Sequence, residues 1–235
     1  MVLLLWMGLV GASWGSQIIS RPLPISAALF TNYNAESFRK LPEARRAIDP
    51  ESINQRLLDA AVFHETNRRR AEHRLPALVY HPKAEEMARI QALAMAKGKF
   101  VDHNNPDPKR KTMEDRAKVV GLRPSVLAEN VASSFGRRYQ SGKSFYTREE
   151  RGRTIYSYEP NGPPIPMHSY ISFAEDLVES WMQSPGHRKN ILHKEPDYLG
   201  CACELPRDPN AMETFYCAQA FFSPLYGDVR QPRRR

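Results

Sequence analysis

Three cysteines lie within one short stretch of the chain, and their spacing permits two kinds of chemistry. Cys201 and Cys203 are separated by one residue, so on a strand both side chains point to the same face. Cys217 lies on a second candidate strand, beyond a turn-like segment at 206–210. In an antiparallel hairpin Cys217 can face either of the other two, which predicts one cross-strand disulfide and one remaining thiol. A zinc knuckle would need a fourth ligand at a spacing such as Cys-x2-Cys, and the sequence has none.

The sequence offers little that is typical of a catalytic nucleophile. It lacks the His-Glu-x-x-His motif of zinc peptidases, and none of its cysteines has neighbours that would activate a thiol. The chain of 235 residues is long enough for one domain with extensions or for two small domains, and its 41% hydrophobic and 26% charged residues are typical of a globular protein. These observations favour a binding protein over an enzyme, with no cofactor required.

The chain is basic, with a formal net charge of +8, and the excess is confined to three segments. Residues 137–159 and the tail 226–235 each carry +3, and residues 16–49 carry +2, which leaves the remainder neutral. Specific nucleic-acid recognition by the main body is therefore not expected. The basic segments could instead bind anionic surfaces or glycans. Within the neutral part, we expect Arg116 and Arg188 to form ion pairs that lock loops.

The N-terminus resembles a signal peptide. Residues 2–12 form an uninterrupted apolar run that is too short to span a membrane, and small residues flank Trp14, which predicts cleavage after Gly15. The alternative is a buried N-terminal strand or helix. Residues 16–49 are predicted to be an extension before the domain, and 226–235 a disordered basic tail. The sequence thus predicts a secreted, extracellular protein.

The order of the expected elements indicates an α+β fold. Apolar residues recur at helical spacing after residue 50 and after His81-Pro82, and these two helices should end at Pro76 and Gly98. Because helices come first and strands mostly last, this order favours an α+β fold over alternating βαβ units. Capping patterns predict further helices that begin at Thr112, Ser172 and Ser184. Short apolar runs predict strands at 129–135, 198–205 and 214–222. A basic Tyr/Arg-rich insert at about 137–165 is predicted to hold an extra hairpin, 145–148 with 154–158.

Five short segments carry a family resemblance. They are NRRRAEHRLPAL (67–78), FVDH (100–103), AENVA (128–132), WMQSPGHRKNIL (181–192) and FYCAQAF (215–221). In this order they resemble the CAP superfamily of cysteine-rich secretory, antigen 5 and pathogenesis-related 1 proteins, especially its bacterial-type SCP domain. The resemblance spans about residues 50–223, and we assign the domain to 50–225.

The resemblance implies an α-β-α sandwich with a surface cleft that gathers two histidines and two acidic residues. Carried over to this chain, the histidines are His103 and His187, and one acid is Glu129. Asn130 and Ser184 also fall in the cleft. Many relatives have a glutamate at the position of Ser184, so the second acid stays open, with the candidates Glu179 and Asp102.

In some members of the superfamily the two histidines hold a divalent metal. His103, His187 and Glu129 would suit Zn²⁺ with an open position for water. Alternatively, Glu129 hydrogen-bonds an imidazole and fixes its tautomer. A third interpretation is that His103 and Glu129 only organise the loops around them.

Three functions follow as hypotheses. The first is a secreted, non-enzymatic module whose cleft binds a small hydrophobic or lipid ligand or a peptide, with a candidate divalent metal. The second is a metal-dependent, peptidase-like hydrolase that uses Zn²⁺ on His103 and His187, with Glu129 as the general base. The third is an extracellular protein that binds polyanions through its basic insert and tail.

Overall fold

The structure, a computed structural model, describes residues 27–150, 152–208 and 211–225. The predicted signal peptide at 1–15, the first part of the predicted extension at 16–26, and the basic tail at 226–235 lie outside these residues. Within the described part of the chain, no helix is long and apolar enough to cross a membrane.

A four-stranded sheet forms the centre of the molecule. Its strands lie in the order β1 (Val79–Tyr80), β5 (Tyr198–Glu204), β6 (Thr214–Pro224) and β2 (Pro124–Phe135), with β1 parallel to β5 and the other pairs antiparallel. The predicted hairpin of β5 and β6 is confirmed. Strand β2 begins five residues before the predicted strand, because β6 provides pairing partners as far as Pro224.

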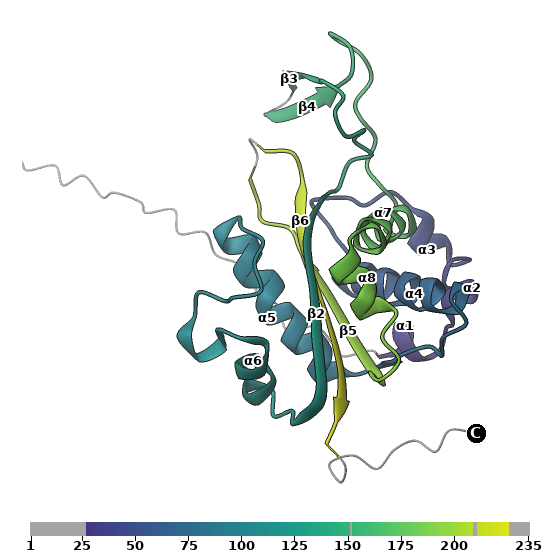
Figure 1. Ribbon diagram of the computed structural model, residues 1–235. Helices are drawn as coiled ribbons and strands as arrows, with labels where there is room; N and C mark the ends of the chain where they lie inside the picture. Colours follow the sequence, from purple (N-terminus) through teal and green to yellow (C-terminus); the bar gives the residue numbers. More distant parts are fainter. Residues whose placement is uncertain (1–26, 151, 209–210, 226–235) are drawn as a thin grey trace, which may run out of the picture.

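Helices cover both faces of this sheet (Figure 1). Helices α4 (Gln55–Glu72), α7 (Tyr170–Gln183) and α8 (Pro185–Ile191) lie on one face, and α5 (Pro82–Gly98) and α6 (Met113–Val119) lie on the other. A short 3-10 helix, Pro108–Arg110, precedes α6. The predicted α+β class and the sandwich of helices around a sheet are thus confirmed.

Alternation along the strands builds two separate cores. In β6, Phe221 packs with α4 and α7, whereas its neighbour Phe222 packs with α5. Successive side chains of a strand point to opposite faces, so one apolar strand can supply both cores. Helix α5 lies against β5 at Gly200, where an added Cβ would come within 2.0 Å of the backbone nitrogen of Glu85. Only glycine permits this close approach.

Residues 27–48 pack onto the domain. They form three short helices, α1 (Ala28–Thr31), α2 (Ala35–Phe38) and α3 (Pro42–Arg45), beside α4 and α7. Phe30, Phe38 and Ile48 from this segment are buried in the same core as α4 and α7. The described part of the predicted extension is therefore integrated with the body of the protein.

Capping signals in the sequence predict the start of α6 correctly and the start of α7 one turn too late. The box of Thr112 and Asp115 is present at the start of α6, as predicted. The predicted N-cap Ser172 is wrong by one turn, since the N-cap of α7 is Ser169. Ser172 is the third helical residue, where its Oγ accepts a hydrogen bond of 2.9 Å from the backbone nitrogen of Ser169. The buried side chain of Tyr170 extends the apolar face of α7 into this first turn.

The insert forms a hairpin of its own. Strands β3 (Tyr146–Glu150) and β4 (Arg153–Ser157) form the expected extra hairpin, which projects beyond the main body (Figure 1).

One of the two possible cysteine pairings is present. Cys203 and Cys217 lie directly opposite each other on β5 and β6 and form the disulfide, whereas Cys201 lies opposite Gln219 and is a buried thiol. The register of the hairpin therefore selects one of the two pairings that the spacing left open.

Candidate functional site

A buried ion pair supports the first of the two histidines. Strand β2 places Glu129, and α6 places Arg116, whose Nη2 donates to Oε2 of Glu129 at 2.6 Å. The other oxygen of Glu129, Oε1, lies 2.9 Å from Nδ1 of His103. Both side chains of the ion pair are fully buried, whereas the His103 side chain is 52% exposed. The arrangement thus fixes a half-exposed imidazole from beneath, and it confirms the predicted ion pair of Arg116.

The loop that carries His103 is held by side chains from its surroundings. Nη1 of Arg116 donates to the carbonyl of His103 at 3.1 Å, and Nε2 of Gln91 donates to the carbonyl of Asp102 at 2.5 Å. Asn105 donates in turn to Oε1 of Gln91 at 3.1 Å. Gln91 and Asn105 are buried, so these bonds are shielded from water. The position of His103 is therefore set by the fold and not by its own loop alone.

The second histidine, His187, is placed by the docking of α8 on β2. Nδ2 of Asn130 donates to the carbonyl of His187 at 3.2 Å. Nδ2 of Asn190, one turn further along α8, donates to Oδ1 of Asn130 at 2.9 Å and to the carbonyl of Glu129 at 3.0 Å. Since Glu129 and Asn130 are neighbours, the same stretch of β2 positions both histidines.

The two imidazoles influence each other electrostatically, and their pKa values shift in opposite directions. The hydrogen bond to the Glu129 carboxylate raises the pKa of His103 above 6.5, and burial opposes this rise. Burial lowers the pKa of His187 below 6.5, and the charge of a protonated His103 lowers it further. Two protonated imidazoles on this surface are therefore disfavoured. A carboxylate only accepts hydrogen bonds, so Nδ1 of His103 carries the proton and Nε2 is free as a ligand when the ring is neutral.

The remaining residues predicted for the cleft have other surroundings. Glu179 of α7 pairs with Arg69 of α4 at 2.8 Å. Oδ1 of Asp102 accepts from the backbone nitrogen of Asn104 at 2.7 Å, which caps the loop. Ser184 joins α7 to α8 and makes no capping hydrogen bond with its side chain. The described residues contain no group of three or more His, Cys, Asp or Glu side chains arranged to hold a metal.

Sequence reasoning missed the amides that hold this region together. Asn190 lies in the SPGHRKNIL block but was given no role, and Gln219 accepts a hydrogen bond of 3.2 Å from Asn130 inside the sheet. Their only signal was the presence of polar residues within otherwise apolar or motif segments.

The predicted ion pair of Arg188 is not found. In contrast to Arg116, the exposed Arg188 has no ion pair among the described residues, so the prediction of an ion pair at Arg188 was wrong.

Comparison with known proteins identifies the family. A family model described as the cysteine-rich secretory protein family, CAP, matches residues 63–221. The chain belongs to the CAP family. No curated protein sequence matches this CAP domain significantly.

Three solved structures similar to this CAP protein come from bacteria. One is an extracellular protein containing a SCP domain from Bacillus anthracis, at 21% identity and a TM-score of 0.49, with 75% of this chain and 44% of that one covered. A second is an outer surface protein from Borrelia burgdorferi, at 14% identity and a TM-score of 0.48, with coverage of 76% and 98%. A third is a cysteine-rich secretory protein from Staphylococcus aureus, at 14% identity and a TM-score of 0.44, with coverage of 72% and 39%. The chain thus spans less than half of the first and third of these proteins.

Proposed function

We propose that the protein is a secreted, non-enzymatic CAP module that binds a divalent metal ion, with Zn²⁺ as the best candidate, on His103 and His187. The observation that carries the proposal is the contact of 2.9 Å between Nδ1 of His103 and the Glu129 carboxylate. Histidines that bind metals generally donate their second ring N–H to a carboxylate or carbonyl in this way. The bond orients the ring and leaves Nε2 as the ligand atom.

The donor set suits a site that is open to solvent and ligands. Two imidazoles provide two of the four positions that Zn²⁺ prefers, and water or a ligand atom would complete them. The bound ion would supply a positive charge that attracts carboxylate, carbonyl or thiolate groups. A peptide or a small ligand that bears such a group is therefore the ligand we propose. We place Glu129 beneath the site, in contact with His103 and Arg116.

The geometry does not favour the hydrolase hypothesis. A general base must reach the proton that it removes, directly or through one water molecule. Both oxygens of Glu129 are already bonded, one to His103 and one to Arg116, and its side chain is fully buried. Glu129 is therefore poorly placed to activate water above the histidines, and a binding role fits the contacts better.

Secretion is supported by the chemistry of the chain. A cross-strand disulfide, Cys203–Cys217, persists in oxidising compartments such as the extracellular space. The apolar run at 2–12 has the length of a signal-peptide core. A metal site on the surface of such a protein is compatible with exchange of ions and ligands from outside the cell.

Calorimetric titration with Zn²⁺ at pH 7.5 tests the proposal. We expect one ion per chain, with affinity reduced at least tenfold, about 1.4 kcal/mol, in His103→Ala and in His187→Ala. His73→Ala is the matched control, because His73 is an exposed histidine whose Nδ1 contacts the Arg69 carbonyl of its own helix. Binding that is unchanged in both cleft variants, or lost equally in the control, would contradict the proposal.

A further inference from the structure

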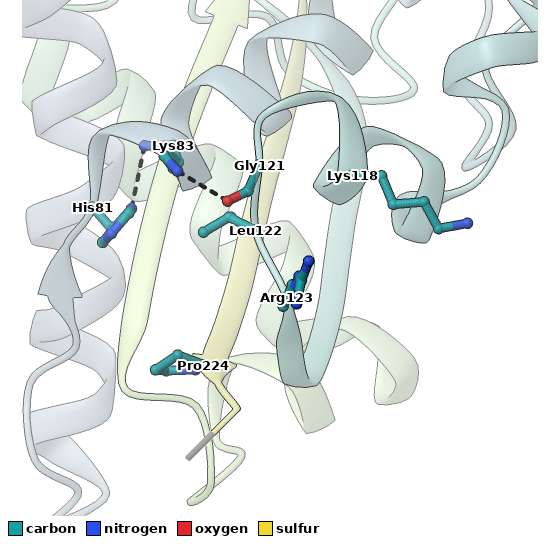
Figure 2. Close-up of a pocket in the computed structure, with 7 residues that line it drawn as sticks. All are labelled: His81, Lys83, Lys118, Gly121, Leu122, Arg123 and Pro224. Atoms are coloured by element: carbon teal, nitrogen blue, oxygen red, sulfur yellow. Dashed lines mark hydrogen bonds between the residues drawn. The ribbon is translucent and has the colours of Figure 1, made fainter. Parts of the chain in front are cut away.

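A basic groove of about 800 Å³ lies at the N-terminal end of β2, whereas the histidines are held at the middle of this strand by Glu129 and Asn130. It opens where the N-terminus of α5, the turn between α6 and β2, and the end of β6 meet (Figure 2). Four of its lining side chains, His81, Lys83, Lys118 and Arg123, are basic, and none is acidic. Arg123 is six residues before Glu129, about 20 Å along an extended strand, so the groove is separate from the histidine site.

Lys83 is held in place by the backbone of the facing turn. Its Nζ donates to the carbonyl of Gly121 at 2.9 Å (Figure 2). Gly121 has a φ of 68°, a conformation that favours glycine, and this turn directs its carbonyl toward the ammonium group. An ammonium group has three protons, so two remain for a ligand. Fixing a long side chain beforehand reduces the entropy lost when a ligand binds.

His81 presents a fixed donor on the same wall. Its Nδ1 accepts a hydrogen bond of 3.2 Å from the backbone nitrogen of Lys83, so in the neutral ring the proton is on Nε2. The ring packs edge-on against Tyr198 and Phe222, with centroids 5.1 and 5.0 Å away. Burial and the nearby charge of Lys83 lower the pKa of His81. At neutral pH the imidazole is therefore an uncharged, well-oriented N–H donor.

Among the described residues, two of the groove's cations have no acidic partner. Lys118 lies 3.4 Å from Asp115, and Figure 2 shows its side chain directed away from Lys83, toward the rim. The carboxylate of Asp197, the residue before β5, accepts a hydrogen bond from Oγ of Ser223. Within the described residues, neither Lys83 nor Arg123 has an ion pair. Two full charges therefore act on the groove.

We propose that this groove binds a small organic phosphate, with the phosphoryl group between Lys83 and Arg123 and in reach of the His81 N–H. A phosphate monoester carries about 1.5–2 negative charges at neutral pH and matches these two cations, whereas a sulfate monoester carries only one. Arginine adds a planar pair of donors suited to phosphate oxygens. The volume of the groove exceeds that of a bare phosphate ion, which leaves room for the organic part.

Amide NMR titration with methyl phosphate tests this inference, and methyl sulfate is the matched probe of lower charge. We expect shifts to be concentrated at the amides of Lys83, Gly121, Leu122 and Arg123, and affinity for methyl phosphate to exceed that for methyl sulfate at least fivefold. The variant Lys83→Gln/Arg123→Gln should weaken binding at least tenfold. Both side chains are exposed, so the variant should keep the thermal unfolding midpoint of the parent chain.

Lys97→Gln/Lys109→Gln is the control, because it removes two exposed positive charges that do not line the groove. It should bind methyl phosphate within twofold of the parent chain. Three outcomes would overturn the inference: no localised shift with methyl phosphate, equal affinity for the two esters, or equal weakening in the control variant. Equal weakening would mean that binding follows net charge and not the groove.

Discussion

Arg116 and Glu129 form a fully buried ion pair, with 2.6 Å between Nη2 and Oε2, directly beneath His103. The guanidinium also bonds the carbonyls of His103, Arg110 and Lys111. One arginine therefore connects α6, the histidine loop and β2. This contact joins the stability of the domain to the geometry of the candidate metal site.

Loss of the Glu129 charge should destabilise the fold strongly. Glu129→Gln leaves the buried Arg116 without its counter-ion, and removal of one partner of a buried pair costs about 3–5 kcal/mol. Urea denaturation of the variant should show a decrease of this size in the free energy of unfolding. Glu114→Gln, an exposed position on α6, is the control and should change it by about 0.5 kcal/mol or less. If Glu129→Gln lowers the free energy of unfolding no more than the control does, the ion pair of Arg116 and Glu129 does not stabilise the fold as expected.

The pKa values of His103 and His187 should lie on opposite sides of 6.5, the ordinary value for histidine. NMR titration of the imidazole protons should give His103 a pKa above 6.5, because of the Glu129 carboxylate, and His187 a pKa below 6.5, because of burial. Since the folded-state pKa of His103 is raised, its contribution to stability is complete below pH 6.5 and is lost as the pH rises through the raised value. Two coincident titrations would refute the contact between His103 and Glu129.

His64 predicts a pH effect of the opposite sign. It is buried against Phe38, with ring centroids 4.4 Å apart, and its Nε2 lies 2.7 Å from the carbonyl of Leu29. Burial lowers its pKa, so its contribution to stability is present above pH 6.5 and is lost as the pH falls toward the lowered value. His64→Gln should therefore flatten the decrease in stability between pH 6.5 and 5. An unchanged slope in this range would mean that His64 does not report on the packing of α1 and α2.

The disulfide should contribute measurably to stability. It links residues separated by 14 positions, and a loop of this size corresponds to about 3 kcal/mol in the chain-entropy model. Cys203→Ala/Cys217→Ala should lower the free energy of unfolding by about 2–4 kcal/mol.

Labelling of the native parent chain should leave Cys201 unmodified, because it is buried and burial raises its thiol pKa well above 9.0. Rapid modification of Cys201 in the native chain would disagree with this placement.

The sequence predicts those parts of the protein that depend on local pattern. The helices after Pro50 and His81, the β5–β6 hairpin and the box at Thr112 all follow from periodicity or capping, which act over a few residues. The box at Ser172 failed because Ser169 offers the same chemistry three residues earlier. The choice between Cys201 and Cys203 depends on hairpin register, which the intervening turn and not the cysteine spacing determines.

Contacts between distant segments account for what the sequence did not predict. Asn130 and Asn190 are 60 residues apart, and their bond exists only because α8 docks on β2. The basic groove likewise combines His81, Gly121 and Pro224, which come from three segments far apart in the sequence. Neither arrangement has a motif of its own, since each arises from the packing of complete elements.

Diffraction from crystals soaked in Zn²⁺, with anomalous data collected at the zinc edge, would show whether His103 and His187 bind the metal. We predict one strong peak about 2.0–2.1 Å from Nε2 of His103 and at a similar distance from a ring nitrogen of His187, with Nδ1 of His103 still bonded to Glu129. A zinc ion on the Glu129 carboxylate, or peaks that involve neither histidine, would contradict it.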